Sequence, residues 1–176
     1  MNNTGSTAGP RDGQATGDLV ASLYRAHAIA LIRLALLLTG DQATAEDVVQ
    51  DAFLRFHQAM PGLRDKDKAL SYLRVSVVNG CRSVQRARRR VWLRRVEHDP
   101  PVWSAESVVI AEQDRRQVLA AVARLPVRAR EVMALRYYLD LPQHEIAAIL
   151  GVSRGTVSST ISRALTTLSR DLKEEL

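Results

Sequence analysis

The chain has 176 residues and 46% of them are hydrophobic, so it can bury a core and is not disordered by composition. Lys and Arg outnumber Asp and Glu by 25 to 19, a net charge of +6 that favours a polyanionic partner without establishing one. The single cysteine, Cys81, excludes an intramolecular disulfide and a zinc site built from several cysteines. We interpret Cys81 as a small, half-buried filler, and expect neither a metal nor a cofactor.

The N-terminal part of the chain combines a polar opening with an apolar helix. Residues 1–17 are rich in Gly, Thr and Asn, which predicts a disordered leader and no secretory signal. A helix is expected at about 18–39. Its strongly apolar run, residues 26–38, is too short to span a bilayer and contains His27 and Arg33. We therefore expect a buried core helix in a soluble, cytoplasmic protein with no membrane insertion.

Apolar residues spaced three and four apart predict helices throughout, and no segment alternates convincingly as a strand would. The adjacent Pro100 and Pro101 favour an extended path. The expected fold is all-α, with two small helical domains joined by an irregular linker. The predicted domains are a leader 1–17, a first domain 18–90, a linker 91–107 and a second domain 108–176. Expected helices after the first run from a cap at Asp41 or Thr44 to about Met60, then at about 68–90, 108–124 and 127–139.

The stretch from Leu141 to Leu168 predicts a helix-turn-helix. Pro142 suits a first helical turn, Gly151 permits the left-handed turn, and Ser153 is placed to cap the second helix. The apolar stripe expected on that second helix is Val157, Ile161, Leu165 and Leu168. The opposite face is short, polar and nearly free of acids, as entry into a DNA major groove requires. It comprises Arg154, Thr156, Ser158, Ser159, Ser162 and Arg163. An ordinary helical hairpin with a solvated Ser/Thr face is the alternative.

The end of the third expected helix is strongly basic. It carries no acid, and its cations are all arginine, whose planar fork matches phosphate geometry. A solvated helix end, favoured by the helix dipole, is the alternative to nucleic-acid binding. The arginines are Arg82, Arg86, Arg88, Arg89 and Arg90. Just upstream, Tyr72 and Asn79 lie two turns apart, and such a pair can stack on an unstacked base and read its edge.

The second expected helix has the opposite charge. Glu46, Asp47 and Asp51 lie in its first turns and are followed by Phe53. Acids near a helix N-terminus stabilise the helix without any further role, so that explanation stays open. On a DNA-binding chain, however, an acidic helix would face a protein.

Taken together, these motifs resemble the extracytoplasmic-function (ECF) sigma factors, compact members of the sigma-70 family. AEDVVQDAFLRF resembles the region that docks on the β′ clamp helices of RNA polymerase. ALSYLRVSVVNGCRSVQRARRR is similar to the helix that reads and melts the −10 element, and the segment from Val118 to Leu168 to the region that reads the −35 element. The resemblance implies a sigma factor that binds core polymerase and directs promoter-specific initiation, assisting strand opening. It is not an enzyme.

The resemblance also implies roles for particular residues. Asp47, Gln50, Asp51 and Phe53 fall on the polymerase-docking motif. Asn79 falls where a flipped base is captured, and Tyr72 where an aromatic flanks the melted strand. The arginines from Arg82 to Arg90 would hold the −10 backbone, and the polar face of the last helix would hold the −35 element. Implied partners are core polymerase, including its β flap, promoter DNA and an anti-sigma factor.

Three positions depart from the family pattern. Val75, Ser158 and Thr160 stand where many relatives carry basic residues, so Arg154 and Arg163 would carry more of the −35 contact. A dimeric helix-turn-helix regulator that acts without polymerase is the alternative function. Such regulators lack the acidic docking helix and the Tyr72–Arg90 element. An enzyme is the third possibility, but His144-Glu145 and the other histidines form no catalytic set.

Overall fold

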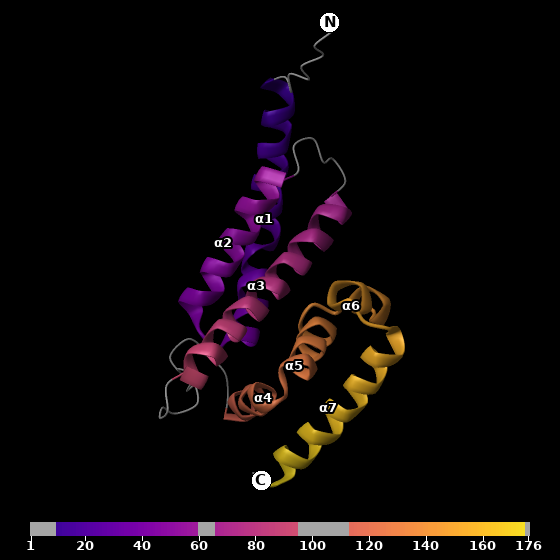
Figure 1. Cartoon of the computed structure of the whole chain (residues 1–176). Helices are drawn as coiled ribbons and strands as arrows, with labels where there is room; N and C mark the ends of the chain where they lie inside the picture. The colour runs from indigo at the N-terminus through magenta and orange to yellow at the C-terminus, as the bar shows by residue number, and fades with distance from the viewer. Residues whose placement is uncertain (1–9, 60–65, 95–112, 175–176) are drawn as a thin grey trace, which may run out of the picture.

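The computed structural model describes residues 10–59, 66–94 and 113–174, and within them every regular element is helical. Three long helices, α1 to α3, lie side by side, and a group of shorter ones with the long α7 packs beside α3 (Figure 1). The all-α prediction is confirmed for this part of the chain. The elements are α1 (Pro10–Thr39), α2 (Gln42–Ala59), α3 (Lys66–Arg94), α4 (Gln113–Arg124), α5 (Val127–Met133), the π-helix η2 (Ala134–Tyr138), α6 (Gln143–Leu150) and α7 (Arg154–Glu174).

The turn between α1 and α2 follows from two residues. Gly40 has φ 76°, a left-handed conformation that glycine adopts readily, and its N–H donates to the Leu36 carbonyl at 2.8 Å. Asp41 then caps α2, because its carboxylate accepts the Thr44 backbone N–H at 2.8 Å. Of the two predicted caps, Asp41 is therefore the one used.

The core of the α1–α3 bundle is tightly packed. Leu34, Phe56, Leu73 and Val77 are fully buried in it. α2 and α3 pack closely at Gly80, where an added Cβ would lie 2.7 Å from the Val48 Cγ1. A side chain at position 80 would force the two helices apart.

Residues 17–39 of α1 are long and apolar enough to cross a membrane by length and composition alone. The apolar run 26–38 is part of this longer helix, so the length of the run alone does not decide whether the helix could span a membrane. Burial accounts for part of its composition: Leu31, Leu34 and Leu38 lie in the protein core, and 28% of the apolar window is buried inside the protein. A core helix passes the same length test as a membrane span.

The two helical units share a hydrophobic core. Val132 and Leu135 of the second unit lie in the same buried cluster as α1–α3, as do Ile146 and Val157. α3 contacts α6, and α1 contacts α5 and η2. A smaller cluster belongs to the second unit alone and contains Ala121, Leu125, Met133, Ala164 and Leu168. The units are thus packed against each other rather than held apart.

Several boundaries differ from those predicted. α1 begins at Pro10, so residues 10–17 of the expected leader are helical; Pro is well suited to a first turn, and extending an existing helix is easier than nucleating one. α3 continues through residues 91–94, which were assigned to the linker, because Leu and Arg are good helix formers and no proline intervenes. The rest of the linker, with Glu97 and Asp99, and the start of the next helix lie outside the described residues. So does the expected break at Pro61-Gly62.

The expected helix at 127–139 changes its hydrogen bonding midway. Its second half is the π-helix η2, where the Leu139 N–H donates to the Ala134 carbonyl at 3.2 Å, and Asp140 follows with φ 49°. The wider turn lets Leu135 and Leu141 both reach the core, whereas Tyr137 is left 58% exposed. Apolar spacing alone does not reveal such a local insertion.

Candidate nucleic-acid and protein interfaces

The helix-turn-helix forms as expected at its turn. Gly151 has φ 66° and ψ 40°, and Val152 donates its N–H to the Ala147 carbonyl at 3.1 Å. Ser153 caps α7 by accepting the Thr156 N–H at 3.1 Å. Pro142 differs slightly from the prediction: it is extended (ψ 153°) and precedes the first helical residue.

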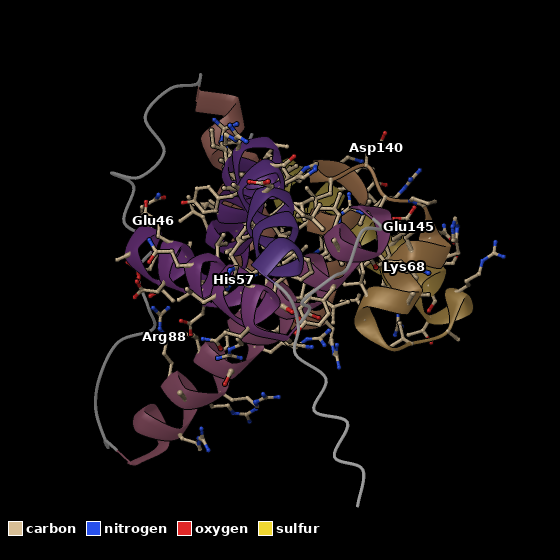
Figure 2. All side chains as sticks on the ribbon, turned by 90° about the horizontal axis from the view of Figure 1, so that it is seen from above. Glu46, His57, Lys68, Arg88, Asp140 and Glu145 are labelled. Atoms are coloured by element: carbon tan, nitrogen blue, oxygen red, sulfur yellow. The ribbon has the colours of Figure 1, made fainter. Side chains whose placement is uncertain are left out.

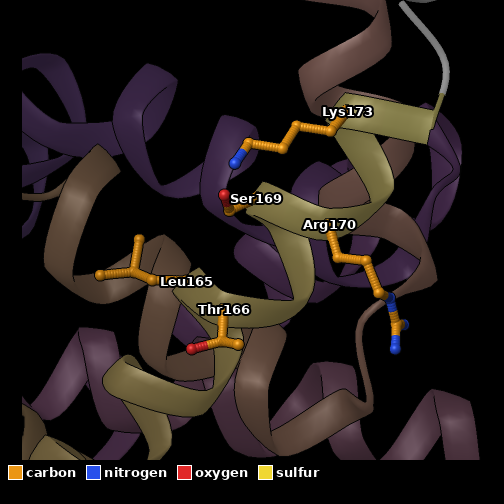
Figure 3. Close-up of a pocket in the computed structure, with 5 residues that line it drawn as sticks. All are labelled: Leu165, Thr166, Ser169, Arg170 and Lys173. Carbon is orange, nitrogen blue, oxygen red and sulfur yellow. The ribbon is translucent and has the colours of Figure 1, made fainter.

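One residue of the α7 apolar stripe was predicted wrongly. Leu165 is 44% exposed, and Ala164 is buried in its place beside Leu168. Ala164 is seven residues after Val157, almost two full helical turns, so it lies on the same face. Leu165 is eight residues after Val157 and therefore lies about 80° away from that face. Leu165 instead borders a shallow surface depression on α7, together with Thr166, Ser169, Arg170 and Lys173 (Figure 3).

The polar face of α7 is fully accessible. All six residues expected to meet the −35 element are exposed: Arg154, Thr156, Ser158, Ser159, Ser162 and Arg163. Ser159 and Thr160 both donate their hydroxyls to the Thr156 carbonyl, at 3.1 and 2.7 Å. Such bonds hold the side chains close to the helix, so the face is low and free of long protrusions except for its two arginines.

A second surface lies on α2. Asp47, Gln50 and Asp51 are exposed, and Asp51 pairs loosely with Arg55 at 3.5 Å. Leu54 is 59% exposed and falls seven residues after Asp47, so the four form one stripe at helical spacing. Sequence reasoning missed Leu54, although its spacing from the acids was available as a signal. We call Asp47, Gln50, Asp51 and Leu54 the α2 stripe.

Phe53, predicted with the acids as a polymerase contact, is placed differently. It is only 4% exposed and packs edge-on against Tyr24, with ring centroids 5.1 Å apart. One residue before Leu54, it points about 100° away from the stripe, into the core. Phe53 therefore supports the α2 stripe from beneath and does not present a ring to a partner.

The third surface is on α3. Asn79 is exposed, and its Oδ1 accepts a hydrogen bond from Arg82 at 3.3 Å. Tyr72 is half-buried, with its ring 5.8 Å from that of Phe56 and tilted by 44°, so part of its surface is used for packing. Val75, a departure from the family pattern, packs against the core.

The α3 arginines fall into two groups. Arg86, Arg89 and Arg90 are exposed. Arg88 is exposed too, but it donates to the Thr39 carbonyl and to the Thr44 hydroxyl, each at 2.9 Å, and lies 3.7 Å from Asp41 (its position is labelled in Figure 2). The hydrogen bonds from Thr44, and then the charge of Arg88, lower the pKa of Asp41.

Arg82 has a partner that the sequence did not predict. Its guanidinium makes two hydrogen bonds of 2.7 Å to the carboxylate of Glu131, which is 1% exposed. Arg128 adds a third contact to Glu131 at 3.2 Å. Glu131 is the only acid in the sequence from Val127 to Leu139, which is the signal that could have singled it out.

The described residues hold no cluster of three or more His, Cys, Asp or Glu that could bind a metal ion. Cys81 is 1% exposed, more buried than predicted, and burial raises the pKa of its thiol to about 12. The thiol is therefore a packing group and not a reactive one.

Comparisons with known proteins agree on one family. Residues 23–91 match the model of sigma-70 region 2, and residues 115–168 match that of sigma-70 region 4. The RNA polymerase sigma-E factor of Streptomyces avermitilis is 34% identical over 145 residues, covering 82% of this chain and 79% of that protein. The ECF RNA polymerase sigma factor SigL of Mycobacterium tuberculosis is 34% identical over 161 residues, covering 89% and 90%.

A solved structure has the same fold. The structure of CnrH in complex with the cytosolic domain of CnrY superposes with a TM-score of 0.66 at 24% identity, covering 94% of this chain and 99% of that one. The sigma factor RpoE in complex with the anti-sigma factor NepR from Bartonella quintana gives 0.60 at 23% identity, covering 91% and 95%. At this identity the two structures support the fold only.

Proposed function

The chain belongs to the ECF branch of the sigma-70 family, and from this membership we propose that it binds RNA polymerase core and directs promoter-specific transcription initiation. It would read the −35 and −10 elements and assist strand opening. Sigma factors are initiation factors rather than enzymes, and we propose no catalytic role. Because its proposed partners, core polymerase and promoter DNA, are cytoplasmic, we propose that the protein acts in the cytoplasm.

One observation carries the proposal over the dimeric-regulator alternative. The exposed α2 stripe and the acid-free α7 face occur in one chain, on different units. An acidic surface repels DNA, so the stripe suits a protein partner, while the low face of α7 suits a major groove. A regulator that acts without polymerase has no use for the first surface.

We propose that each of the two helical units has its own function. Residues 18–90 would act as region 2 and residues 108–176 as region 4, with residues 91–107 as the linker between them. In region 2, Asp47, Gln50, Asp51 and Leu54 would contact the β′ clamp helices. In region 4, the exposed face of α7 would enter the −35 major groove and another part of the unit would meet the β flap.

The −10 element would be read by α3. Asn79 would capture a flipped base, and the exposed part of Tyr72 would stack beside it. Arg86, Arg89 and Arg90 are free to contact backbone phosphates, and Arg82 and Arg88 could do so after leaving their present partners. An anti-sigma factor is a further candidate partner.

Reconstitution with purified core polymerase tests the proposal. The chain should remain bound to core on a sizing column, and the holoenzyme should enrich a promoter with two conserved elements from random DNA. Failure to bind core, together with tight, dimeric binding of the free chain to a palindromic site, would establish the regulator instead.

A further inference from the structure

We propose that Glu131 is a latch that keeps the free protein closed by occupying Arg82, a −10-reading arginine, until core polymerase is bound. The inference rests on the proposed function, because it treats Arg82 as a promoter contact. It concerns the packing of the second helical unit on α3.

The Arg82–Glu131 contact has the geometry of an arginine bound to phosphate. Nε donates to one carboxylate oxygen and a terminal nitrogen to the other, both at 2.7 Å. The Arg82 side chain is 16% exposed and that of Glu131 is 2% exposed. The Nε–Nη2 edge of a guanidinium accommodates one oxyanion at a time, so while Glu131 holds this edge a DNA phosphate cannot use it, and burial leaves little of the side chain accessible.

The latch also reaches the base-reading residue. Arg82 donates a further hydrogen bond to the Oδ1 of Asn79 at 3.3 Å, so it occupies the acceptor with which that amide would recognise a base. In the closed protein both groups are engaged at once. Once Glu131 is released, Arg82 can turn toward a phosphate, and only if it does so is Asn79 also freed from their contact within α3.

Other contacts hold the two units in the same arrangement. Arg74 of α3 lies 3.4 Å from Glu145 of α6, and Arg130 of α5 donates to the Leu38 carbonyl at the end of α1, at 3.4 Å. Figure 1 shows α5 and α6 alongside α3. Beneath these bonds lie Leu135 and Ile146 in the shared core. Opening exposes this apolar surface to water, so the open form of the free protein is a minority that grows when a partner covers the surface or when a polar contact is removed.

The docking surface remains available while the latch is closed. Asp47, Gln50, Asp51 and Leu54 are all exposed in this arrangement. Core polymerase can therefore bind region 2 first, and separation of the units can follow. Binding of the −10 element through Arg82 would then depend on polymerase, because only the bound, open form presents Arg82.

A matched pair of variants tests the latch in the full chain. Glu131→Gln keeps the shape of the side chain and removes its charge. Asp140→Asn removes the same charge from the same unit at a position whose side chain is 98% exposed and points away from the bundle (Figure 2). Asp140 has φ 49°, which Asn tolerates, and its contact with Arg136 is 4.0 Å long.

The readouts are binding of a fluorescein-labelled oligothymidine by anisotropy and the radius of gyration from X-ray scattering. We expect Glu131→Gln to bind about tenfold more tightly than wild type and to be more expanded, because a larger fraction is open. Asp140→Asn should match wild type in both. Wild-type affinity and compactness in folded Glu131→Gln would overturn the latch.

Two further measurements keep the result clear. If Glu131→Gln does not fold, Glu145→Gln serves instead: its side chain is 44% exposed, and we expect about twofold tighter binding. An unchanged Glu145→Gln would then contradict the latch. Binding of wild type to core polymerase is measured in parallel. Its absence refutes the proposed function, whereas intact core binding with no effect of either variant refutes the latch alone.

Discussion

The two helices proposed to contact DNA, α3 and α7, satisfy their polar side chains in different ways. On α7 the hydroxyls of Ser159, Thr160 and Thr166 donate to carbonyls of the same helix. On α3 the side chains of Arg82 and Arg88 reach other helices, where they meet Glu131 and the end of α1. The proposed −35 surface is therefore fully exposed in the free protein, while part of the proposed −10 surface is engaged in contacts between helices. Regulation by domain packing would act on the −10 element first.

The largest expected effect lies on neither DNA helix but on the α2 stripe. Asp51→Arg reverses the charge at the centre of the stripe and should abolish binding to core polymerase. The fold should survive, because Asp51 is exposed and makes one loose pair with Arg55. Binding is measured by co-elution with core, and folding by circular dichroism.

Glu46→Arg is the control for this variant. Glu46 is also exposed and on the same helix, but it lies at the edge of the stripe, one turn before Gln50. Both residues lie beyond the first turn of α2, where the helix dipole acts, so both reversals should cost little stability. Equal core affinity for the two variants would remove the centre of the stripe from the docking surface and leave Asp51 as a solvated surface residue.

The next effect distinguishes base reading from phosphate contact on α3. Asn79→Ala should cost about 1 to 3 kcal/mol at one −10 position and flatten the preference there. Because the base is available only when unstacked, the loss should appear in strand opening more than in initial binding. The assay is open-complex formation by holoenzyme on promoters varied at each −10 base.

Arg89→Ala is the companion variant. Arg89 is exposed, and its loss should weaken all promoters alike and make the salt dependence shallower by about one phosphate contact. An Asn79→Ala variant that also weakened every promoter alike would show that Asn79 only packs or contacts the backbone.

The third prediction compares the packing around two glycines, Gly80 of α3 and Gly155 of α7. Gly80→Ala places a Cβ 2.7 Å from Val48 Cγ1, whereas at Gly155 of α7 the nearest atom to an added Cβ is the Ser153 hydroxyl at 3.8 Å. Gly80→Ala should lower the free energy of unfolding by about 1 to 3 kcal/mol. Gly155→Ala should raise it by up to about 1 kcal/mol, because alanine is the better helix former. Urea denaturation of both variants measures the difference, and equal effects would show that α2 and α3 separate without cost.

Sequence patterns predicted the local features of this molecule well. Gly151 and Ser153 act at their turn as expected, because turn and cap chemistry depends on neighbouring residues only. The surfaces were also largely predictable: the acids of α2 and the polar face of α7 are exposed. The spacing of these residues along each helix was sufficient to predict that they share one exposed face.

Non-local contacts were not predictable from one sequence. Glu131 and Arg82 are 49 residues apart, and nothing in their spacing links them. The resemblance to a docking motif implied that Phe53 contacts polymerase, but its ring packs against Tyr24 of another helix, which the motif does not show. The packing of the two units likewise depends on which apolar faces meet, and periodicity only shows that each helix has one.

The smallest expected effect concerns Asp41, at the end of α1 that also receives Arg88. Its pKa is lowered below the usual 3.8, by the hydrogen bonds from Thr44 and then by the charge of Arg88. The stabilisation from the ionised carboxylate is therefore present above pH 3.8 and is lost as the pH falls through the lower folded value. Asp41→Asn keeps a capping oxygen but has no charge to lose. At neutral pH it should be less stable than wild type by no more than about 0.5 kcal/mol, since Asn caps nearly as well and the site is partly exposed. Urea denaturation at several pH values should show this difference shrinking toward zero below pH 3.8. A difference that stayed constant across the acid range would mean that the Asp41 charge, and with it the contact to Arg88, does not stabilise this corner.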